Sequence, residues 1–244
     1  ILAITEHHCS ENCMKVLDFN NYKVMSYFCR QNHECGGNLF YVKDEYKDLV
    51  TELNCTKFIV EMSFECCAIE LLTKNFKICI INLYRPCDGQ FEIFFDQLYD
   101  ALEYFSRRYK IVYLCGDFNI NYLEVNVHKL LLQDLLTSFG LRCTSDKPTR
   151  VFVNKNGRIS STKIDYITTN DNDYEQISKV IQPNIGDHLA MTYMIKITPI
   201  LKNSNTPTNK QRKLTSSGLE FLQSIMSSFN FDQVFYDMSN INAV

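Results

Sequence analysis

The chain has 244 residues, of which 45% are hydrophobic, and a formal net charge of −3 at pH 7. This length fits one α/β domain with a substantial core. The charge excludes a globally basic nucleic-acid-binding surface. No run approaches the roughly 18 apolar residues of a membrane span, so no membrane partner is expected. Eleven cysteines, several of them in apolar runs, indicate buried reduced thiols of an intracellular, non-secreted protein.

The N-terminal run Ile1–Thr5 has the pattern of a β-strand, and we expect the sequence to start in the middle of that strand rather than before it. It has neither an initiator methionine nor a basic leader before a long apolar stretch, so it is not predicted to be a signal peptide. We interpret the chain as a fragment of a longer protein.

Strand-like runs dominate the sequence, and two helical patterns interrupt them. The first helix carries an apolar stripe from Phe91 to Phe105, and the second spans about 126–139 and is stopped by Gly140. Many strands with few helices predict an α/β (α+β) fold with a sheet-on-sheet core and outer helices. The expected strands are 1–5, 22–28, 38–43, 57–64, 66–72, 76–83, 110–115, 163–168, 177–182 and 189–197.

The amino-acid composition changes near residue 199. Residues 199–213 are rich in Asn, Thr, Ser, Pro and Lys and are predicted to form an exposed linker. Residues 214–244 regain a helical pattern but are too short for a domain, so they are expected to begin a further region. The predicted domain therefore covers residues 1–198.

Acidic and amide side chains follow the strand 110–115. Asp117 and Asn119 come directly after Gly116, which allows a tight turn. Ligands of open α/β sheets collect at the carboxyl ends of strands. Asp117 there could hold a metal or orient a water, and Asn119 could donate its amide to a phosphate oxygen.

Two other strand ends carry suitable residues. Glu6 ends the first strand and could bind Mg²⁺, although a surface glutamate is the simpler interpretation. Tyr84 and Arg85 end the strand 76–83. The tyrosine could donate to a phosphate oxygen and the arginine could contact a DNA phosphate. A rim tyrosine with a solvated arginine is equally plausible.

Asp165 lies inside an apolar strand, where a carboxylate is costly to bury unless it is paired. His188 is a suitable partner, because a carboxylate fixes the imidazole tautomer and stabilises its charged form. A backbone donor or a basic residue would be the alternative. Asp187 precedes this histidine, so an acid and an imidazole again stand together.

These motifs follow one another in a characteristic order. The chain resembles the endonuclease/exonuclease/phosphatase superfamily of DNase-I-like and apurinic-endonuclease-like proteins, and most of all the endonuclease domain of non-LTR (LINE-type) retrotransposons. The resemblance covers residues 1 to about 197 and implies a four-layer α/β sandwich, in which two packed β-sheets are flanked by helices. The motifs are Thr5-Glu6, Gly36-Gly37, Tyr84-Arg85-Pro86, Gly116 to Asn119, Pro148-Thr149-Arg150, Ile164-Asp165-Tyr166 and Asp187-His188.

The resemblance also implies roles for residues and partners. The enzyme would use Mg²⁺, or Mn²⁺, to nick one DNA strand and leave a 3′-hydroxyl that primes reverse transcription. It would be a monomeric nuclear domain, joined to a reverse transcriptase region in its parent polyprotein. The implied roles are metal binding for Glu6 and Asp187, phosphate contact for Tyr84, Arg85 and Asn119, water activation for Asp117, and stabilisation or protonation at the phosphate for His188, held by Asp165.

Two departures from the family pattern stand out. Gly186 replaces the usual serine before Asp-His. The family's first strand and helix, about 25–40 residues, are also absent, so an edge strand would be unpaired and a neighbour of Glu6 lost. We therefore expect a poorly active, aggregation-prone chain, testable by comparing plasmid nicking with an N-terminally extended protein. The alternatives are an inactive truncated relic and a phosphomonoesterase or phosphoinositide phosphatase of the same fold.

Overall fold

The structure is a computed structural model that describes residues 1–14, 16–17, 20–153, 157, 159–172, 176–183 and 186–195. The chain divides into two compact units, Ile1–Gln182 with His188–Leu201, and Pro183–Asp187 with Lys202–Val244. All helices and strands below belong to the first unit. The predicted linker 199–213 and the segment 214–244 lie outside the described residues.

A six-stranded sheet forms the centre of the first unit. Its strand order is β4-β5-β6-β7-β11-β8, and β6 and β7 are parallel while the other neighbours are antiparallel. The parallel pair requires a crossover connection, which a helix between the two strands provides. The strands are β4 (Val50–Leu53), β5 (Glu65–Leu72), β6 (Lys77–Tyr84), β7 (Ile111–Asp117), β8 (Arg142–Cys143) and β11 (Asp165–Thr169).

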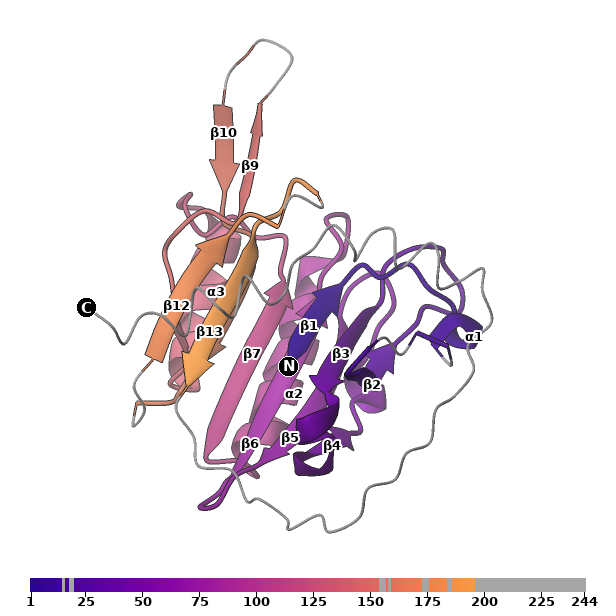
Figure 1. Cartoon of the computed structure of the whole chain (residues 1–244). Coiled ribbons are helices and arrows are strands. Elements are labelled where there is room, and N and C mark those ends of the chain that lie inside the picture. The colour runs from indigo at the N-terminus through magenta and orange to yellow at the C-terminus, as the bar shows by residue number, and fades with distance from the viewer. Residues whose placement is uncertain are drawn as a thin grey trace, which may run out of the picture. The chain divides into compact units, whose positions relative to one another are not determined.

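Helices α2 (Phe91–Ser106) and α3 (Val127–Ser138) pack on one face of this sheet, and Figure 1 shows α2 behind β5, β6 and β7. The apolar stripe of α2 faces the sheet, as the helical periodicity predicted. Asn126 caps α3 by accepting a hydrogen bond from Lys129 N at 2.9 Å. The core between helices and sheet includes Phe94, Leu98, Leu102, Leu132 and Leu136.

A second layer covers part of the opposite face of the six-stranded sheet (Figure 1). It consists of the antiparallel sheet β1-β3-β2 and the antiparallel pair β12-β13. Phe40 and Val42 of β3 pack against Ile69 and Ile78 in a second apolar core, to which Tyr193 of β13 contributes. The strands are β1 (Leu2–Thr5), β2 (Tyr22–Phe28), β3 (Asn38–Lys43), β12 (Gln176–Ile181) and β13 (Ala190–Ile195).

These layers confirm the predicted α/β sandwich with two packed sheets. On the side of the second layer, the only α-helix among the described residues is the single turn α1 (Glu11–Met14). Among the described helices, none combines the length and apolarity needed to cross a bilayer. All eleven cysteines are free, and several are buried in the strands, such as Cys66, Cys67 and Cys79.

The structure corrects several predicted elements. Residues 57–64 do not form the expected strand, because Thr56–Phe58 is a short 3₁₀ helix that precedes a turn. Strands β4 and β8 were not predicted. Neither was the hairpin of β9 (Arg150–Val153) and β10 (Ile159–Thr162), which projects from the rest of the first unit in Figure 1.

Candidate functional site

The ends of β6 and β7 approach each other closely at Gly116. This residue has φ +129°, and a Cβ added to it would lie 1.8 Å from the carbonyl oxygen of Leu83. Only glycine allows this approach. The parallel register then places Tyr84 beside Asp117, so two of the predicted site residues meet at one sheet edge.

Asp117 is a buried carboxyl group beside a second one. It is 4% exposed, and it pairs with Asp165 in the antiparallel register of β7 and β11. Its oxygens accept hydrogen bonds from Asn119 N at 2.9 Å and Asn119 Nδ2 at 3.3 Å. Burial, followed by the charge of Asp165, raises the pKa of Asp117 to about 8. The carboxyl group can therefore exchange a proton near neutral pH.

Asp165 and His188 form the pair that the sequence predicted. His188 Nδ1 lies 3.1 Å from Asp165 Oδ2 and 3.3 Å from Oδ1. The His188 side chain is 35% exposed and that of Asp165 is 20% exposed, so the imidazole remains open to solvent while its partner orients it.

Thr149 joins the two segments that carry this pair. Its buried Oγ1 accepts hydrogen bonds from Ile164 N and Asp165 N, both at 3.1 Å. Its carbonyl oxygen accepts one from Leu189 N at 2.6 Å. The residue thus ties the start of β11 to the chain that follows His188. Thr149 belongs to the Pro148-Thr149-Arg150 motif, but the sequence alone predicted no role for its side chain.

Glu6 and Tyr84 form a second polar pair. The Tyr84 hydroxyl donates to Glu6 Oε1, and burial followed by this bond raises the pKa of Tyr84 well above its usual value. The phenol therefore remains protonated and acts as a donor. Glu6 itself is exposed and adopts φ +55°, with its N–H donating to Gly37 O at 2.7 Å. Its charge is close enough to raise the pKa of Asp117 further.

Arg85 does not occupy the predicted place at the surface. Its side chain is 1% exposed, and the guanidinium stacks 4.2 Å from the centroid of the Phe91 ring. Its nitrogens donate to the carbonyl oxygens of Phe118 at 2.8 Å, Gly89 at 2.9 Å and Asn119 at 3.0 Å. All three nitrogens are engaged with backbone, so this arginine joins the loop after β7 to the turn at Gly89, and a contact between Arg85 and DNA stays a prediction.

Asn119 and Asp187 take different positions. Asn119, at φ +49°, donates its side-chain amide to Arg85 O at 2.8 Å and to Asp117, so in this structure it orients the acid. A contact between Asn119 and phosphate stays a prediction. Asp187 is exposed, immediately precedes His188 and belongs to the second unit. Its predicted metal-binding role also stays a prediction.

The donor set fits a hard divalent cation. Asp117, Asp165 and His188 each offer one ligand atom, and these atoms lie within 4.8 Å of one another. Carboxylate oxygens dominate the cluster, as Mg²⁺ or Mn²⁺ prefers. The cluster differs from the predicted pair Glu6 and Asp187. Asp165 is already engaged with His188, and metal binding by Glu6 stays a prediction.

Several residues at the site were not predicted. Glu65 is fully buried and pairs with Arg30, and Asn82 donates its amide to Ile4 O at 2.9 Å and Leu39 O at 3.1 Å. A signal was available for Glu65, since it is a single acid at the start of an apolar run, the same pattern that drew attention to Asp165. The same signal was available for Asn82, a single amide inside the apolar run of the predicted strand 76–83.

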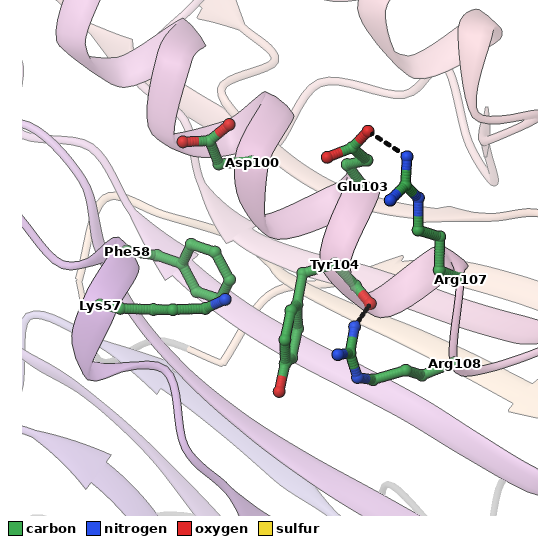
Figure 2. Close-up of a pocket in the computed structure, with 7 residues that line it drawn as sticks. All are labelled: Lys57, Phe58, Asp100, Glu103, Tyr104, Arg107 and Arg108. Carbon is green, nitrogen blue, oxygen red and sulfur yellow. Dashed lines mark hydrogen bonds and ion pairs between the residues drawn. The ribbon is translucent and has the colours of Figure 1, made fainter.

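A surface pocket of about 400 Å³ shares no residue with this site. Figure 2 shows it between α2 and the 3₁₀ helix, with Lys57 and Arg108 beside Tyr104. The cations lie 3.7 Å and 3.5 Å from the centroid of that ring, and Arg107 is paired with Glu103 at 2.7 Å. The three cationic side chains of the pocket therefore contact other residues of its lining.

No protein-family model and no curated protein matches the sequence. Solved structures do match in fold. The Xenopus laevis APE2 catalytic domain is 15% identical, with a TM-score of 0.60, and the match covers 82% of this chain and 84% of that one. The endonuclease domain of TRAS1, a telomere-specific non-LTR retrotransposon, is 16% identical (TM-score 0.57), with coverage of 73% and 81%.

The Neisseria 3′ phosphatase NExo, bound to a product DNA hairpin, is 14% identical with a TM-score of 0.57, and the match covers 80% of this chain and 88% of that one. These likenesses show that the chain has the endonuclease/exonuclease/phosphatase fold, as the order of its motifs predicted. At such identities the likeness is one of fold, so the chemistry is argued from the site.

Proposed function

We propose that this chain is a divalent-metal-dependent phosphodiesterase that nicks DNA and leaves a 3′-hydroxyl from which reverse transcription is primed. The observation that carries the proposal is the convergence of Asp117, the Asp165–His188 pair and the Glu6–Tyr84 pair at the ends of neighbouring strands. Such a set can activate a water, stabilise charge on a phosphate and hold a cation.

Each residue has a role in this proposal. Asp117 takes the proton of the attacking water when it is ionised, and its raised pKa makes this carboxylate a stronger base than a solvated one. His188, oriented by Asp165, stabilises the charge that develops on the phosphate oxygens. Tyr84 donates its hydroxyl at the same edge. Mg²⁺ or Mn²⁺ held by Glu6 would neutralise phosphate charge.

The substrate assignment rests on similarity of fold and on the order of the motifs. Solved structures with this fold include an endonuclease domain of a non-LTR retrotransposon and a DNA 3′ phosphatase. On this proposal the partners are DNA and a reverse transcriptase region of the same polyprotein, and the protein acts as a monomer in the nucleus. Size-exclusion chromatography and imaging of the tagged protein would test the last two points.

A plasmid-nicking assay tests the proposed function. With Mg²⁺, the protein should convert supercoiled plasmid to open circles, and EDTA should abolish the reaction. Asp117→Asn and His188→Ala should each lower the rate by about 10²-fold or more, the usual range for lost acid–base or electrostatic catalysis. The exposed Asp134 and His33 supply matched controls as Asp134→Asn and His33→Ala.

The alternatives give different results in the same experiment. Nicked ends that a polymerase extends without further treatment would support a 3′-hydroxyl product. Release of phosphate from 3′-phosphorylated DNA without nicking would favour a phosphomonoesterase, as in the Neisseria 3′ phosphatase of the same fold. An absence of both activities with Mg²⁺ and Mn²⁺ would contradict the proposal and support an inactive relic.

A further inference from the structure

A buried ion pair lies beside the candidate site. Arg30, which follows β2, contacts Glu65 at the start of β5, with 2.6 Å between Arg30 Nε and Glu65 Oε1. The two side chains are 6% and 0% exposed. Desolvating two charges offsets much of their attraction, so a buried ion pair is weak evidence for a purely stabilising role. What the pair holds in place is therefore informative.

Glu65 uses both carboxylate oxygens to fix neighbouring backbone. Oε1 accepts from Arg30 Nε and from Met62 N at 3.2 Å, while Oε2 accepts from Gly37 N at 3.0 Å. A carboxylate can accept on both sides, whereas an amide of the same shape has a single acceptor oxygen. A glutamine at this position would leave an NH₂ group facing a donor on one side.

Gly37 connects the ion pair to Glu6. Its carbonyl oxygen accepts the N–H of Glu6 at 2.7 Å, and its own φ is +82°. A Cβ at this position would lie 2.5 Å from His7 Nε2, so a side chain here would disturb the hydrogen bond between Glu6 N and Gly37 O. Glu6 also has a positive φ, a conformation that surrounding contacts must maintain in a non-glycine residue.

Arg30 approaches the partner of Glu6 from another direction. Its guanidinium carbon lies 5.8 Å from the centroid of the Tyr84 ring, within the range of a cation–π contact. The hydroxyl of that tyrosine donates to Glu6. The ion pair thus contacts both supports of the Glu6 carboxylate, the backbone through Gly37 and the phenol through its ring.

We propose that the buried Arg30–Glu65 pair is a positioning element of the site, which fixes the Glu6 carboxylate and thereby sets the affinity for the divalent cation. The inference rests on the proposed function, in which Glu6 holds that cation. Groups that orient a metal ligand change metal affinity by about 10–100-fold when they are removed.

The test compares Glu65→Gln with the unmodified protein over a range of Mg²⁺ concentrations. The Mg²⁺ concentration for half-maximal nicking should rise about 10–100-fold, and saturating Mg²⁺ should restore most of the rate. Isothermal titration calorimetry with Mn²⁺, in the absence of DNA, should show the same loss of affinity. A merely structural role would lower the rate equally at every Mg²⁺ concentration.

Glu70→Gln is the matched control, because Glu70 lies on the same strand and is also paired. Its carboxylate contacts Lys77 Nζ at 2.8 Å and the Tyr109 hydroxyl at 2.8 Å, and neither partner belongs to the site. The Glu70→Gln protein should need the same Mg²⁺ concentration for half-maximal nicking as the unmodified protein. If Glu65→Gln fails to fold, Arg30→Lys provides the same comparison while keeping a positive charge beside Glu65.

The outcomes separate this inference from the proposed function. A folded Glu65→Gln or Arg30→Lys protein that binds Mn²⁺ as tightly as the unmodified protein would overturn the positioning role, even if nicking were intact. A protein that binds Mn²⁺ but cuts no DNA would contradict the nuclease proposal. In that case, a loss of Mn²⁺ affinity in Glu65→Gln would still support the positioning role.

Discussion

At the scale of single residues, Asp117 has its carboxyl group in a place with little solvent. Its carboxyl group is 4% exposed and lies opposite Asp165, so ionisation adds a second charge to a place with little solvent. In the folded protein its pKa is raised from 3.8 to about 8. The folded state therefore holds a proton that the unfolded chain has already released over this range of pH.

This shift predicts a pH dependence of stability. Because the folded pKa lies above the unfolded one, the stabilisation is complete below about pH 4 and is lost as the pH rises towards 8. Without divalent cations, Asp117→Asn should flatten that decline and raise the free energy of unfolding at pH 8 by about 1–3 kcal/mol, since one pKa unit corresponds to about 1.4 kcal/mol. Thermal melts from pH 5 to pH 9 measure the effect.

The control for this prediction is Asp134→Asn, an exposed acid on α3. It should leave the pH dependence of the unmodified protein in place. An Asp117→Asn protein with the same decline between pH 5 and pH 8 would contradict the assignment of the proton to this carboxyl group.

At the scale of elements, the start of β11 depends on Thr149, which satisfies two backbone donors. Thr149→Val keeps the shape but removes the acceptor, so Ile164 N and Asp165 N become buried without a partner. We expect a loss of about 1–3 kcal/mol in stability for each unsatisfied group and a lower nicking rate, as Asp165 shifts. Urea denaturation and the plasmid assay measure the two effects.

Thr168→Val is the control on the same strand. Thr168 is also fully buried, but its hydroxyl makes only a long contact of 3.4 Å to Leu114 O. It should lose less stability and retain nicking activity. Equal losses of activity in the two variants would show that general weakening of β11, and not the position of Asp165, limits the rate.

The elements also show what the sequence could reveal. Strands β6 and β7 were predicted as 76–83 and 110–115, close to their observed bounds, because both faces of these strands are largely buried and the runs are nearly continuously apolar. The segment 57–64 misled the prediction. Its apolar residues include Phe58, which reaches the core from a 3₁₀ helix, and a short apolar run does not reveal that difference.

The chemistry of single residues predicted part of the site, but it did not predict which strands bring those residues together. The pairing of Asp165 with His188 follows from the cost of burying a carboxylate. The opposition of Asp117 and Asp165 depends on the register of two strands far apart in the chain, which no local pattern contains. Arg85 shows the same limit, because three backbone carbonyls and an aromatic ring that bury it come together only in the fold.

At the scale of the whole molecule, the cluster of two acids and a histidine predicts that a cation stabilises the folded protein. The cluster of Asp117, Asp165 and His188 exists only when β7, β11 and the segment before β13 are assembled. A cation that binds this state but not the unfolded chain should raise the melting temperature, by an amount corresponding to about 2.7 kcal/mol at 100 times its Kd.

Differential scanning fluorimetry with increasing Mg²⁺ or Mn²⁺ measures this effect, and EDTA should reverse it. Asp117→Asn should reduce the gain, whereas Asp134→Asn should not. A melting temperature that does not respond to either cation would argue against a metal site in the folded protein.

The contact between Gly116 and Leu83 has a wider consequence. Tyr84 and Asp117 each come one residue after this contact, on strands held in a single register. The backbone therefore cannot adjust the phenol without also moving the acid. If the proposed function is correct, changes in the substrate that the protein accepts would have to arise in the surrounding loops, because the contact between the two strands keeps Tyr84 and Asp117 aligned.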